Sequence, residues 1–232
     1  MASTDAHTHG HDYAAANKAL FDAKAAELDA NPEFRALARS IAGTLLRTYP
    51  ALFAPERTAL LDFACGTGLV AFELAPHVRT LLGVDISDGM AARFNARAAE
   101  LGLAHKARAV VAALTGAPGE LDGQQFDVVL CSMAYHHLAA PADTTALLAR
   151  LLRPGGTLLV LDFAARDYTQ EEIPEEFRAA VAHAAGFAED DVRAMFEGAG
   201  LEGFELREGV KMAIGGKERD IFVARGVRAP DA

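Results

Sequence analysis

The spacing of hydrophobic positions changes near Pro55 and divides the chain into two kinds of structure. Before that point the apolar residues recur with a helical period, and two helix starts are marked. Asp12 can cap a helix that runs to about Leu28, and Asn31, followed by a proline, can cap a second one. One face of the second helix carries the apolar residues Phe34, Leu37, Ile41 and Leu45. The spacing therefore predicts two helices, of which the second turns an apolar stripe inward.

After that point, short apolar runs alternate with helical segments. Seven runs have the length and composition of strands, and they cover residues 58–63, 80–84, 107–111, 126–132, 157–163, 203–209 and 219–224. Helices are expected from residue 67 and over residues 87–101, 141–152 and 189–199. Strands separated by helices predict an α/β fold with a doubly wound, mostly parallel sheet and right-handed crossovers. Gly215 and Gly216 are expected to form the turn before the last strand.

Composition narrows the function classes. The 232 residues are 51% hydrophobic, enough for a sizeable core, and their net charge is −10. No Lys/Arg-rich run is present, so nucleic acid is not an expected partner. The apolar runs are too short to span a bilayer, and the first ten residues lack the apolar core of a signal peptide. These features predict a cytoplasmic protein without a membrane span, in which Cys65 and Cys131 are reduced thiols.

The stretch "LLDFACGTGLVAFELA" at residues 60–75 is a glycine-rich turn between a strand and a helix. Such turns let a ligand approach the backbone, and the helix start offers unpaired N–H groups. Gly66, Gly68 and Ala71 match the G-x-G-x-x-A spacing, and Asp85 lies 19 residues after Gly66. This spacing alone does not separate a nicotinamide enzyme from another adenosine binder.

Asp62 favours one of these ligands. A carboxylate before the glycines would repel a dinucleotide pyrophosphate, whereas S-adenosylmethionine has no phosphate and carries an ammonium group. Asp85 can accept hydrogen bonds from ribose hydroxyls of either ligand. The sequence therefore favours S-adenosylmethionine, whose product is S-adenosylhomocysteine, over a nicotinamide cofactor.

Four motifs together resemble the Rossmann-fold (class I) S-adenosylmethionine-dependent methyltransferases, especially small-molecule enzymes similar to those of quinone biosynthesis. They are "DFACGTG", "LLGVDIS", "FDVVLCSMAYHHL" and "LLRPGGTLLVLDF", between about residues 58 and 163. The resemblance implies a seven-stranded sheet with an antiparallel last strand. It also implies a helical cap at residues 12–54 and a cofactor-binding domain at 55–226, with an acceptor-pocket insertion at 169–187. The small, polar, His-containing residues 1–11 are expected to form a disordered tail.

The resemblance also implies which residues contact the cofactor. The methionine part is expected near Asp62, Ala64, Gly66, Gly68, Cys131 and Ser132, and the ribose and adenine near Asp85, Ile86 and Met90. Tyr13 is expected to close over the cofactor from the first helix, with Asn17 and Phe21 beside it. Many relatives have an acidic residue after the third strand, but this chain has "VVAALTG" there. Ala113 and Leu114 are therefore expected to offer only apolar or main-chain contacts.

The stretch "SMAYHHLA" at residues 132–139 follows the fourth strand, where ligands of doubly wound sheets bind. Tyr135, His136 and His137 are the candidate catalytic residues, because a histidine can remove a hydroxyl proton near neutral pH. Adjacent residues point apart in regular structure, so only one of the two histidines is expected to reach the acceptor. His183 is expected to share a helix with Phe177 and Val181 in the acceptor-pocket insertion.

The leading prediction is methyl transfer to a small molecule, first to oxygen and less readily to carbon, sulfur or nitrogen. Two alternatives stay open: a nicotinamide-dependent oxidoreductase, and a catalytically silent cofactor-binding protein. The histidines His7, His9 and His11 alternate as in some metal sites, but a flexible tail has nothing to orient their rings, and no metal is predicted. The oligomeric state is left open.

Overall fold

A single sheet forms the centre of the computed structural model, which describes residues 11–166, 169–214 and 217–230. In these residues seven strands pair in the order β3-β2-β1-β4-β5-β7-β6. The strands are β1 (Ala59–Phe63), β2 (Thr80–Asp85), β3 (Ala107–Val111), β4 (Phe126–Ser132), β5 (Leu152–Phe163), β6 (Leu201–Ile214) and β7 (Lys217–Arg228). The first five strands are parallel to one another, and β7 runs antiparallel to both β5 and β6. The predicted fold class is thereby confirmed.

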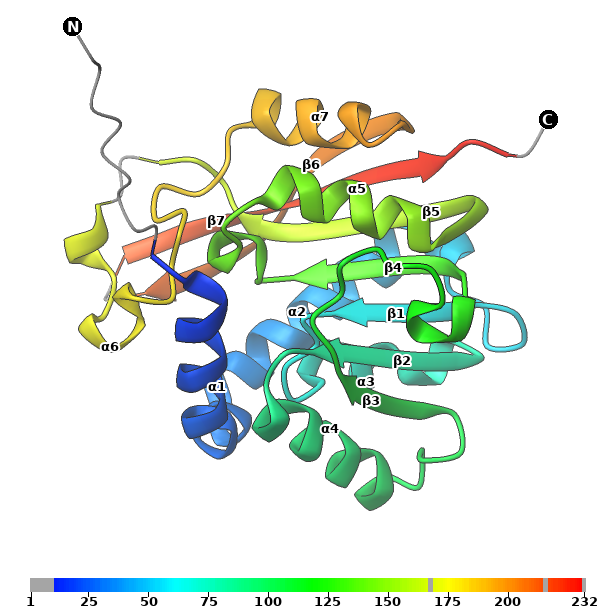
Figure 1. Ribbon diagram of the computed structural model, residues 1–232, viewed down its shortest axis with the longest axis horizontal. Coiled ribbons are helices and arrows are strands. Elements are labelled where there is room, and N and C mark those ends of the chain that lie inside the picture. The colour runs from blue at the N-terminus through cyan, green and yellow to red at the C-terminus, as the bar shows by residue number, and fades with distance from the viewer. Residues whose placement is uncertain (1–10, 167–168, 215–216, 231–232) are drawn as a thin grey trace, which may run out of the picture.

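Helices cover both faces of this sheet (Figure 1). They are α1 (Tyr13–Ala30), α2 (Pro32–Thr48), α3 (Leu69–Leu74), α4 (Asp88–Glu100), α5 (Pro141–Leu151), α6 (Glu175–Arg178) and α7 (Glu189–Gly198). Strand residues alternate between two hydrophobic clusters, since Leu60 joins the cluster of α2, α3 and α4 whereas Leu61 joins that of α5 and α7. Burial on both faces explains why the strands read as continuous apolar runs.

The predicted helix starts are confirmed where a side chain caps the helix. Asp12 accepts from the backbone N–H of Ala15, and Asn31 accepts from that of Glu33, as their positions before α1 and α2 predict. The last three strands are longer than predicted, because β6 and β7 pair along most of their length and β5 begins next to α5. The turn predicted at Gly215 and Gly216 lies outside the described residues, as do residues 1–10.

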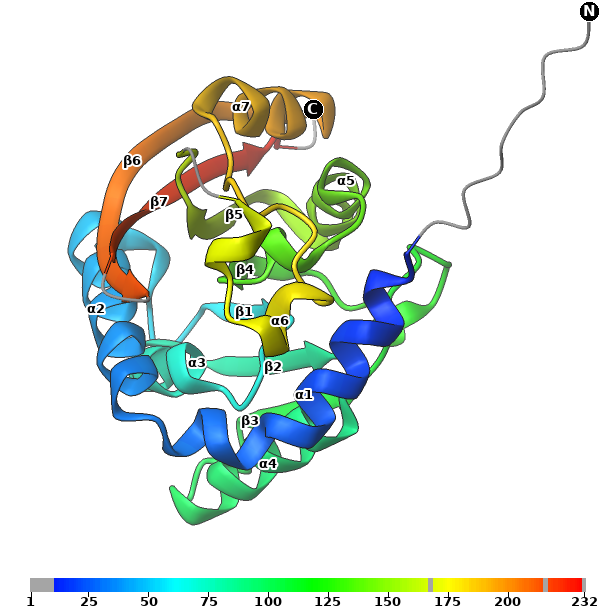
Figure 2. The ribbon, with the colours of Figure 1, turned by 90° about the vertical axis from the view of Figure 1, so that its left-hand side faces the viewer.

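The carboxyl ends of the parallel strands meet at one edge, and α1 crosses that edge. In Figure 1 the arrowheads of β1, β2 and β4 point toward α1 and α6, and Figure 2 looks onto that edge with both helices in front. Ligands of doubly wound sheets bind outside this edge. The loops after β1, β2, β4 and β5, together with α1, therefore form the candidate site.

Candidate active site

The glycine-rich loop after β1 has a backbone that side chains would disturb. Ala64, Gly66 and Gly68 all have positive φ angles, of 54°, 52° and 80°. A Cβ at Gly68 would lie 2.6 Å from the rings of Phe72 and Phe94, so that position requires glycine. A Cβ at Gly66 would meet only the sulfur of Met90, at 4.0 Å. The loop therefore packs against the core at Gly68 and leaves its backbone open to a ligand at Gly66.

Asp62 is the buried carboxylate at the end of β1. Its side chain is almost fully enclosed, with 2% exposed, and its Oδ1 has no hydrogen-bond partner among the described residues. Burial, and then the nearby charge of Asp85, raise the pKa of Asp62 to about 8. An unpaired buried carboxylate is costly, and a cationic donor would relieve that cost. This observation fits the ammonium group of the predicted cofactor.

Asp85 joins the loops that follow β1 and β2. Its Oδ2 accepts from the backbone N–H of Gly66 at 2.8 Å, and its Oδ1 accepts from that of Ser87 at 2.9 Å. Burial raises the pKa of Asp85, although these backbone donors act in the opposite direction. Each carboxylate oxygen keeps a further lone pair. Asp85 can therefore order both loops and still accept from the two hydroxyls of a ribose.

The remaining predicted cofactor residues differ in what they can offer. Met90 is buried and Ile86 half-buried beside the β2 loop, while Ala113 is exposed and Leu114 half-buried after β3. The N–H of Ala112 donates to the carbonyl of Asp85, which brings that apolar segment close to Asp85. The segment can supply apolar and main-chain contacts to an adenine, as predicted from its lack of an acidic residue.

The two cysteines face opposite clusters of the core. Cys65 belongs to the α2, α3 and α4 cluster, whereas the fully buried Cys131 belongs to the α5 and α7 cluster. Both are free, and burial raises the pKa of each thiol well above its usual value. The Cys131 side chain therefore packs on the face of the sheet that α5 and α7 cover, and the half-buried Ser132 follows it at the end of β4.

Tyr135 lies in the core, which corrects the prediction that it contacts the acceptor. It opens the short helix η4 (Tyr135–His137) after β4, and only 1% of its surface is exposed. Its hydroxyl hydrogen-bonds Thr145 Oγ1 on α5 at 3.0 Å, and burial raises its pKa. The aromatic ring thus packs between β4 and α5, where a buried phenol finds a hydroxyl partner.

The two adjacent histidines lie against each other, which corrects the expectation that they point apart. Their ring centroids are 4.1 Å apart with a 40° angle between the planes. The expectation assumed a strand or an α-helix, but Met133 has a φ of 56° and the chain then enters a 3-10 turn. Both rings therefore reach the same side of the carboxyl edge.

His136 is oriented by a buried carboxylate. Its Nδ1 lies 2.8 Å from Asp162 Oδ1 and 3.1 Å from Oδ2, and its backbone N–H donates to Oδ2 at 3.2 Å. Burial opposes the charge of Asp162, but the His136 ring and the N–H groups of His136 and Phe163 hold its pKa below the usual value. With Nδ1 facing a carboxylate, Nε2 is the nitrogen that can take up a proton.

The sequence reasoning did not identify Asp162 as a site residue. Asp162 stands near the end of β5 in "LLVLDF", and β5 pairs with β4 up to Ser132↔Leu161. A carboxylate that ends an otherwise apolar buried strand was therefore the available signal, because β4 and β5 end at the same edge.

His137 is a neutral ring. Its Nδ1 lies 2.8 Å from the carbonyl oxygen of Ala180, which can only accept, so Nδ1 carries the hydrogen. Burial, and then the neighbouring His136, lower the pKa of His137 to about 3. Its Nε2 is therefore a hydrogen-bond acceptor at neutral pH. The ring of Phe21 on α1 stacks edge-on against it at 5.2 Å.

Asn17 brings α1 to this histidine turn. Its Nδ2 donates to the carbonyls of Tyr13 and His137, at 2.7 and 3.2 Å, which fixes the orientation of the amide. The side chain is buried, with 6% exposed, and its Oδ1 has no partner in the described part of the chain. Asp62 and Asn17 therefore both present unpaired acceptors, one on β1 and one on α1.

The 169–187 segment covers the histidine turn without being a continuous helix. Helix α6 ends at Arg178, so His183 does not share a helix with Phe177, and this corrects the prediction. The N–H groups of Ala182 and His183 donate to the carbonyl of His136, at 2.8 and 3.0 Å, and His183 Nε2 donates to the carbonyl of Leu138 at 3.0 Å. These bonds attach the segment to the loop after β4.

The described residues contain neither a metal-binding cluster of side chains nor a helix that could span a membrane. No group of three or more His, Cys, Asp or Glu side chains there is arranged to hold a metal ion. His11 Nε2 instead donates to the carbonyl of Ala179 at 2.6 Å, and His7 and His9 lie outside the described residues. Within the described chain, no helix has both the length and the hydropathy required to cross a bilayer.

Known proteins with similar sequences are methyltransferases. A family model described as a methyltransferase domain matches residues 61–160. An uncharacterized methyltransferase of Schizosaccharomyces pombe is 34% identical over 155 residues, which are 64% of this chain and 55% of the relative. A ubiquinone biosynthesis O-methyltransferase of Methylococcus capsulatus is 33% identical over 100 residues, which are 42% and 40% of the two chains. The chain spans about half the length of the curated relatives it matches.

A solved structure shares the fold. Magnesium protoporphyrin IX methyltransferase from Synechocystis, with bound S-adenosylhomocysteine, has a TM-score of 0.58 and 18% identity, covering 84% of this chain and 83% of its own. This likeness shows the fold, and the sequence matches favour the methyltransferase interpretation over a nicotinamide oxidoreductase. Residues 61–160 thus match a methyltransferase domain, and the sequence relatives support the predicted class I S-adenosylmethionine-dependent methyltransferase with S-adenosylmethionine as the cofactor.

Proposed function

We propose that this protein transfers the methyl group of S-adenosylmethionine to an oxygen of a small molecule. One observation carries the proposal: His136, held by the buried Asp162, lies at the same sheet edge as the unpaired carboxylate of Asp62. A site for a sulfonium amino acid and a site for a proton are thus combined at one edge. The relatives named as ubiquinone biosynthesis O-methyltransferases support oxygen as the methylated atom.

The cofactor side of the site binds and orients. Asp62 would take the ammonium group, Asp85 would accept from the ribose hydroxyls, and the open backbone at Gly66 would contact the methionine part. Bound there, S-adenosylmethionine supplies a methyl group on a sulfonium, which is open to in-line attack. Because burial stabilises the protonated form of Asp62 in the free protein, ligand binding ionises this carboxyl.

The acceptor side removes a proton. When the acceptor oxygen bonds to the methyl carbon, the bond from that carbon to sulfur would break and leave S-adenosylhomocysteine, while the acceptor O–H bond would break and its proton pass to Nε2 of His136. Asp162 accepts from Nδ1, which keeps the ring in the tautomer whose Nε2 is free and stabilises the imidazolium that forms. The proton then leaves to water when the product departs.

Acceptor recognition rests on the neighbouring polar atoms. Nε2 of His137 and Oδ1 of Asn17 both accept hydrogen bonds, so an acceptor with additional O–H or N–H groups would satisfy them. The 169–187 segment and α1 would enclose that molecule, with residues 12–54 as the helical cap and 55–226 as the cofactor-binding domain. The net charge of −10 favours small molecules over polyanions, in keeping with a cytoplasmic role.

Thermal unfolding with S-adenosylmethionine, S-adenosylhomocysteine and nicotinamide dinucleotides at equal concentrations tests the ligand. A ligand at 100 times its Kd stabilises by about 2.7 kcal/mol, or about 5 to 10 °C for a domain of this size. We expect shifts with the first two ligands only.

A screen for S-adenosylhomocysteine formation with small phenols, carboxylates, thiols and amines then tests transfer. Activity with hydroxyl acceptors supports the proposal, and activity with thiols or amines alone would contradict oxygen as the target. Binding without turnover on any acceptor class would leave the catalytically silent protein as the better description.

A further inference from the structure

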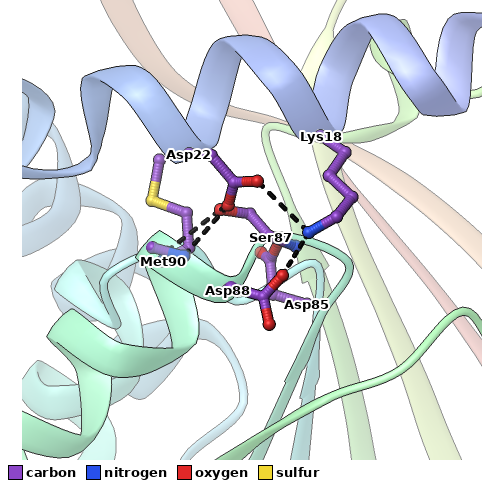
Figure 3. Close-up of polar contacts among 7 residues, drawn as sticks. Lys18, Asp22, Asp85, Ser87, Asp88 and Met90 are labelled. Carbon is purple, nitrogen blue, oxygen red and sulfur yellow. Dashed lines mark hydrogen bonds and ion pairs between the residues drawn. The ribbon is translucent and has the colours of Figure 1, made fainter.

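Asp22 lies on the face of α1 that meets the loop after β2, near Asp85 (Figure 3). Its Oδ1 accepts from the hydroxyl of Ser87 at 2.6 Å and from the backbone N–H of Gly89 at 3.0 Å. Its Oδ2 pairs with Lys18 at 3.2 Å, and Lys18 also reaches Asp88. One oxygen of Asp22 thus serves the loop, while the other serves an exposed ion pair.

Ser87 connects Asp22 to Asp85. The Ser87 hydroxyl donates to Asp22 and accepts from the N–H of Met90, while the Ser87 N–H donates to Asp85 Oδ1. Ser87 is fully buried, so its position depends on these three partners. The backbone N–H of Gly89 and the Ser87 hydroxyl hold the pKa of Asp22 at about 2, which keeps it ionised. Hydrogen bonds through Ser87 therefore connect Asp22 on α1 to the carboxylate of Asp85.

Helix α1 contacts the other loops of the edge as well. Asn17 donates to the carbonyl of His137, and Asp29 interacts with Thr67 of the glycine-rich loop and with Arg93 and Arg97 of α4. Because these contacts are independent of Asp22, α1 should stay attached when Asp22 is replaced. The role of Asp22 can therefore be separated from the attachment of the helix.

We propose that Asp22 is a positioning residue for cofactor binding, which acts through Ser87 to hold Asp85 at the ribose hydroxyls. The inference rests on the proposed function, in which Asp85 accepts from the ribose. Asp22 itself would not touch the ligand. The charge of Asp22 is unfavourable for ionised Asp85, because it raises the pKa of Asp85. Its value for binding therefore lies in the two hydrogen bonds to the loop.

The charge of Asp22 and its hydrogen bonds predict opposite effects on ligand binding when Asp22 is replaced. If only charge mattered, removing Asp22 would make Asp85 easier to ionise and would not weaken ligand binding. If geometry matters, Asp22→Ala weakens binding, and Asp22→Asn restores it because an amide oxygen can replace Oδ1 at both donors. Ser87→Ala removes the same connection from the other side.

Isothermal titration of the full chain with S-adenosylhomocysteine measures the effect. We expect Asp22→Ala to weaken binding about fivefold to twentyfold, and Asp22→Asn to stay within about threefold of wild type. Asp88→Asn is the matched control. It removes the charge of the other ion-pair partner of Lys18 between α1 and α4, and it leaves the hydrogen bond between Asp22 and Ser87 in place. It should stay within about twofold. Circular dichroism melting checks that each variant is folded.

A double-mutant cycle with Asp85→Asn identifies the route of the effect. The double variant should bind S-adenosylhomocysteine less than about twofold more weakly than Asp85→Asn alone. Full additivity, or wild-type affinity for Asp22→Ala, would overturn the inference. If Asp85→Asn itself binds like wild type, the ribose assignment of the proposed function fails instead, so the two failures are distinguishable.

Discussion

The cofactor side and the acceptor side of the carboxyl edge are built in different ways. On the cofactor side, Asp62 lies in β1 and Asp85 ends β2, the next strand along the chain. Backbone N–H groups hold the carboxylate of Asp85. On the acceptor side, His136 depends on Asp162, which is 26 residues away, and His137 depends on Ala180, which is 43 residues away. A local motif thus specifies the first, and tertiary contacts specify the second. Mutations on the two sides should therefore change different measured quantities.

The largest expected effect is on turnover when His136 is replaced. His136→Gln should lower kcat about 10² to 10⁴-fold with an acceptor found by screening, because no base then receives the hydroxyl proton. S-adenosylhomocysteine affinity should stay within about twofold, since the ring does not serve the cofactor. Asp162→Asn should lower kcat less than His136→Gln, because the His136 ring is still present and loses only the charge that orients it. If S-adenosylhomocysteine affinity fell by the same factor as kcat, His136 would also serve cofactor binding, and the two sides would not be functionally separate.

The next largest effect is on cofactor affinity when Asp62 is replaced. Asp62→Asn removes the negative charge that faces the ammonium group, and S-adenosylhomocysteine binding should weaken about 100-fold, a change of about 2.7 kcal/mol. Isothermal titration measures this, with Asp143→Asn on the exposed first turn of α5 as the control for a lost carboxylate. Affinity within threefold of wild type for Asp62→Asn would show that the ammonium binds elsewhere.

A smaller effect on the cofactor side comes from pH. The pKa of Asp62 in the free protein is about 8, so at pH 7 about 0.9 of a proton is bound there. Pairing with an ammonium favours the ionised form, and ligand binding should therefore release that proton. The sign follows: affinity rises with pH up to about pH 8, by up to about tenfold per pH unit, and then levels off.

Titrations in buffers of different ionisation enthalpy measure this proton release. It should approach zero above pH 8 and vanish in Asp62→Asn at every pH. A release that persists in Asp62→Asn would assign the proton to another group and weaken the account of Asp62 as an unpaired buried acid.

The same contrast explains what the sequence could predict. The alternation of strands and helices, the caps of α1 and α2 and the placement of Asp62 and Asp85 follow from local signals, which are apolar runs, capping residues and glycine spacing. The partnership of His136 with Asp162 was not predicted, because two strand ends had to be brought together first. Neither was the unpaired oxygen of Asn17, since its burial depends on α1 crossing the edge.

Tyr135 shows the limit of reading a site from residue types. A phenol beside two histidines suggested acid–base chemistry, but the positive φ at Met133 turns the chain so that Tyr135 enters the core and the two histidines remain at the edge. No sequence signal marks that turn, because Met133 is not a residue that favours positive φ. Side-chain direction after a strand end was therefore the least predictable feature of the site.

The smallest expected effect is on turnover when Tyr135 loses its hydroxyl. Thr145 Oγ1 donates to the carbonyl of Pro141 at 2.8 Å, so the Tyr135 hydroxyl is the donor in their shared hydrogen bond. Tyr135→Phe leaves the Thr145 donor satisfied and should lower the free energy of unfolding by about 1 kcal/mol, while kcat and S-adenosylhomocysteine affinity stay within about twofold. Chemical denaturation and steady-state kinetics measure both. If kcat instead fell more than tenfold in a stably folded variant, the tyrosine would reach the acceptor, and the boundary between core and acceptor side would have to move to include it.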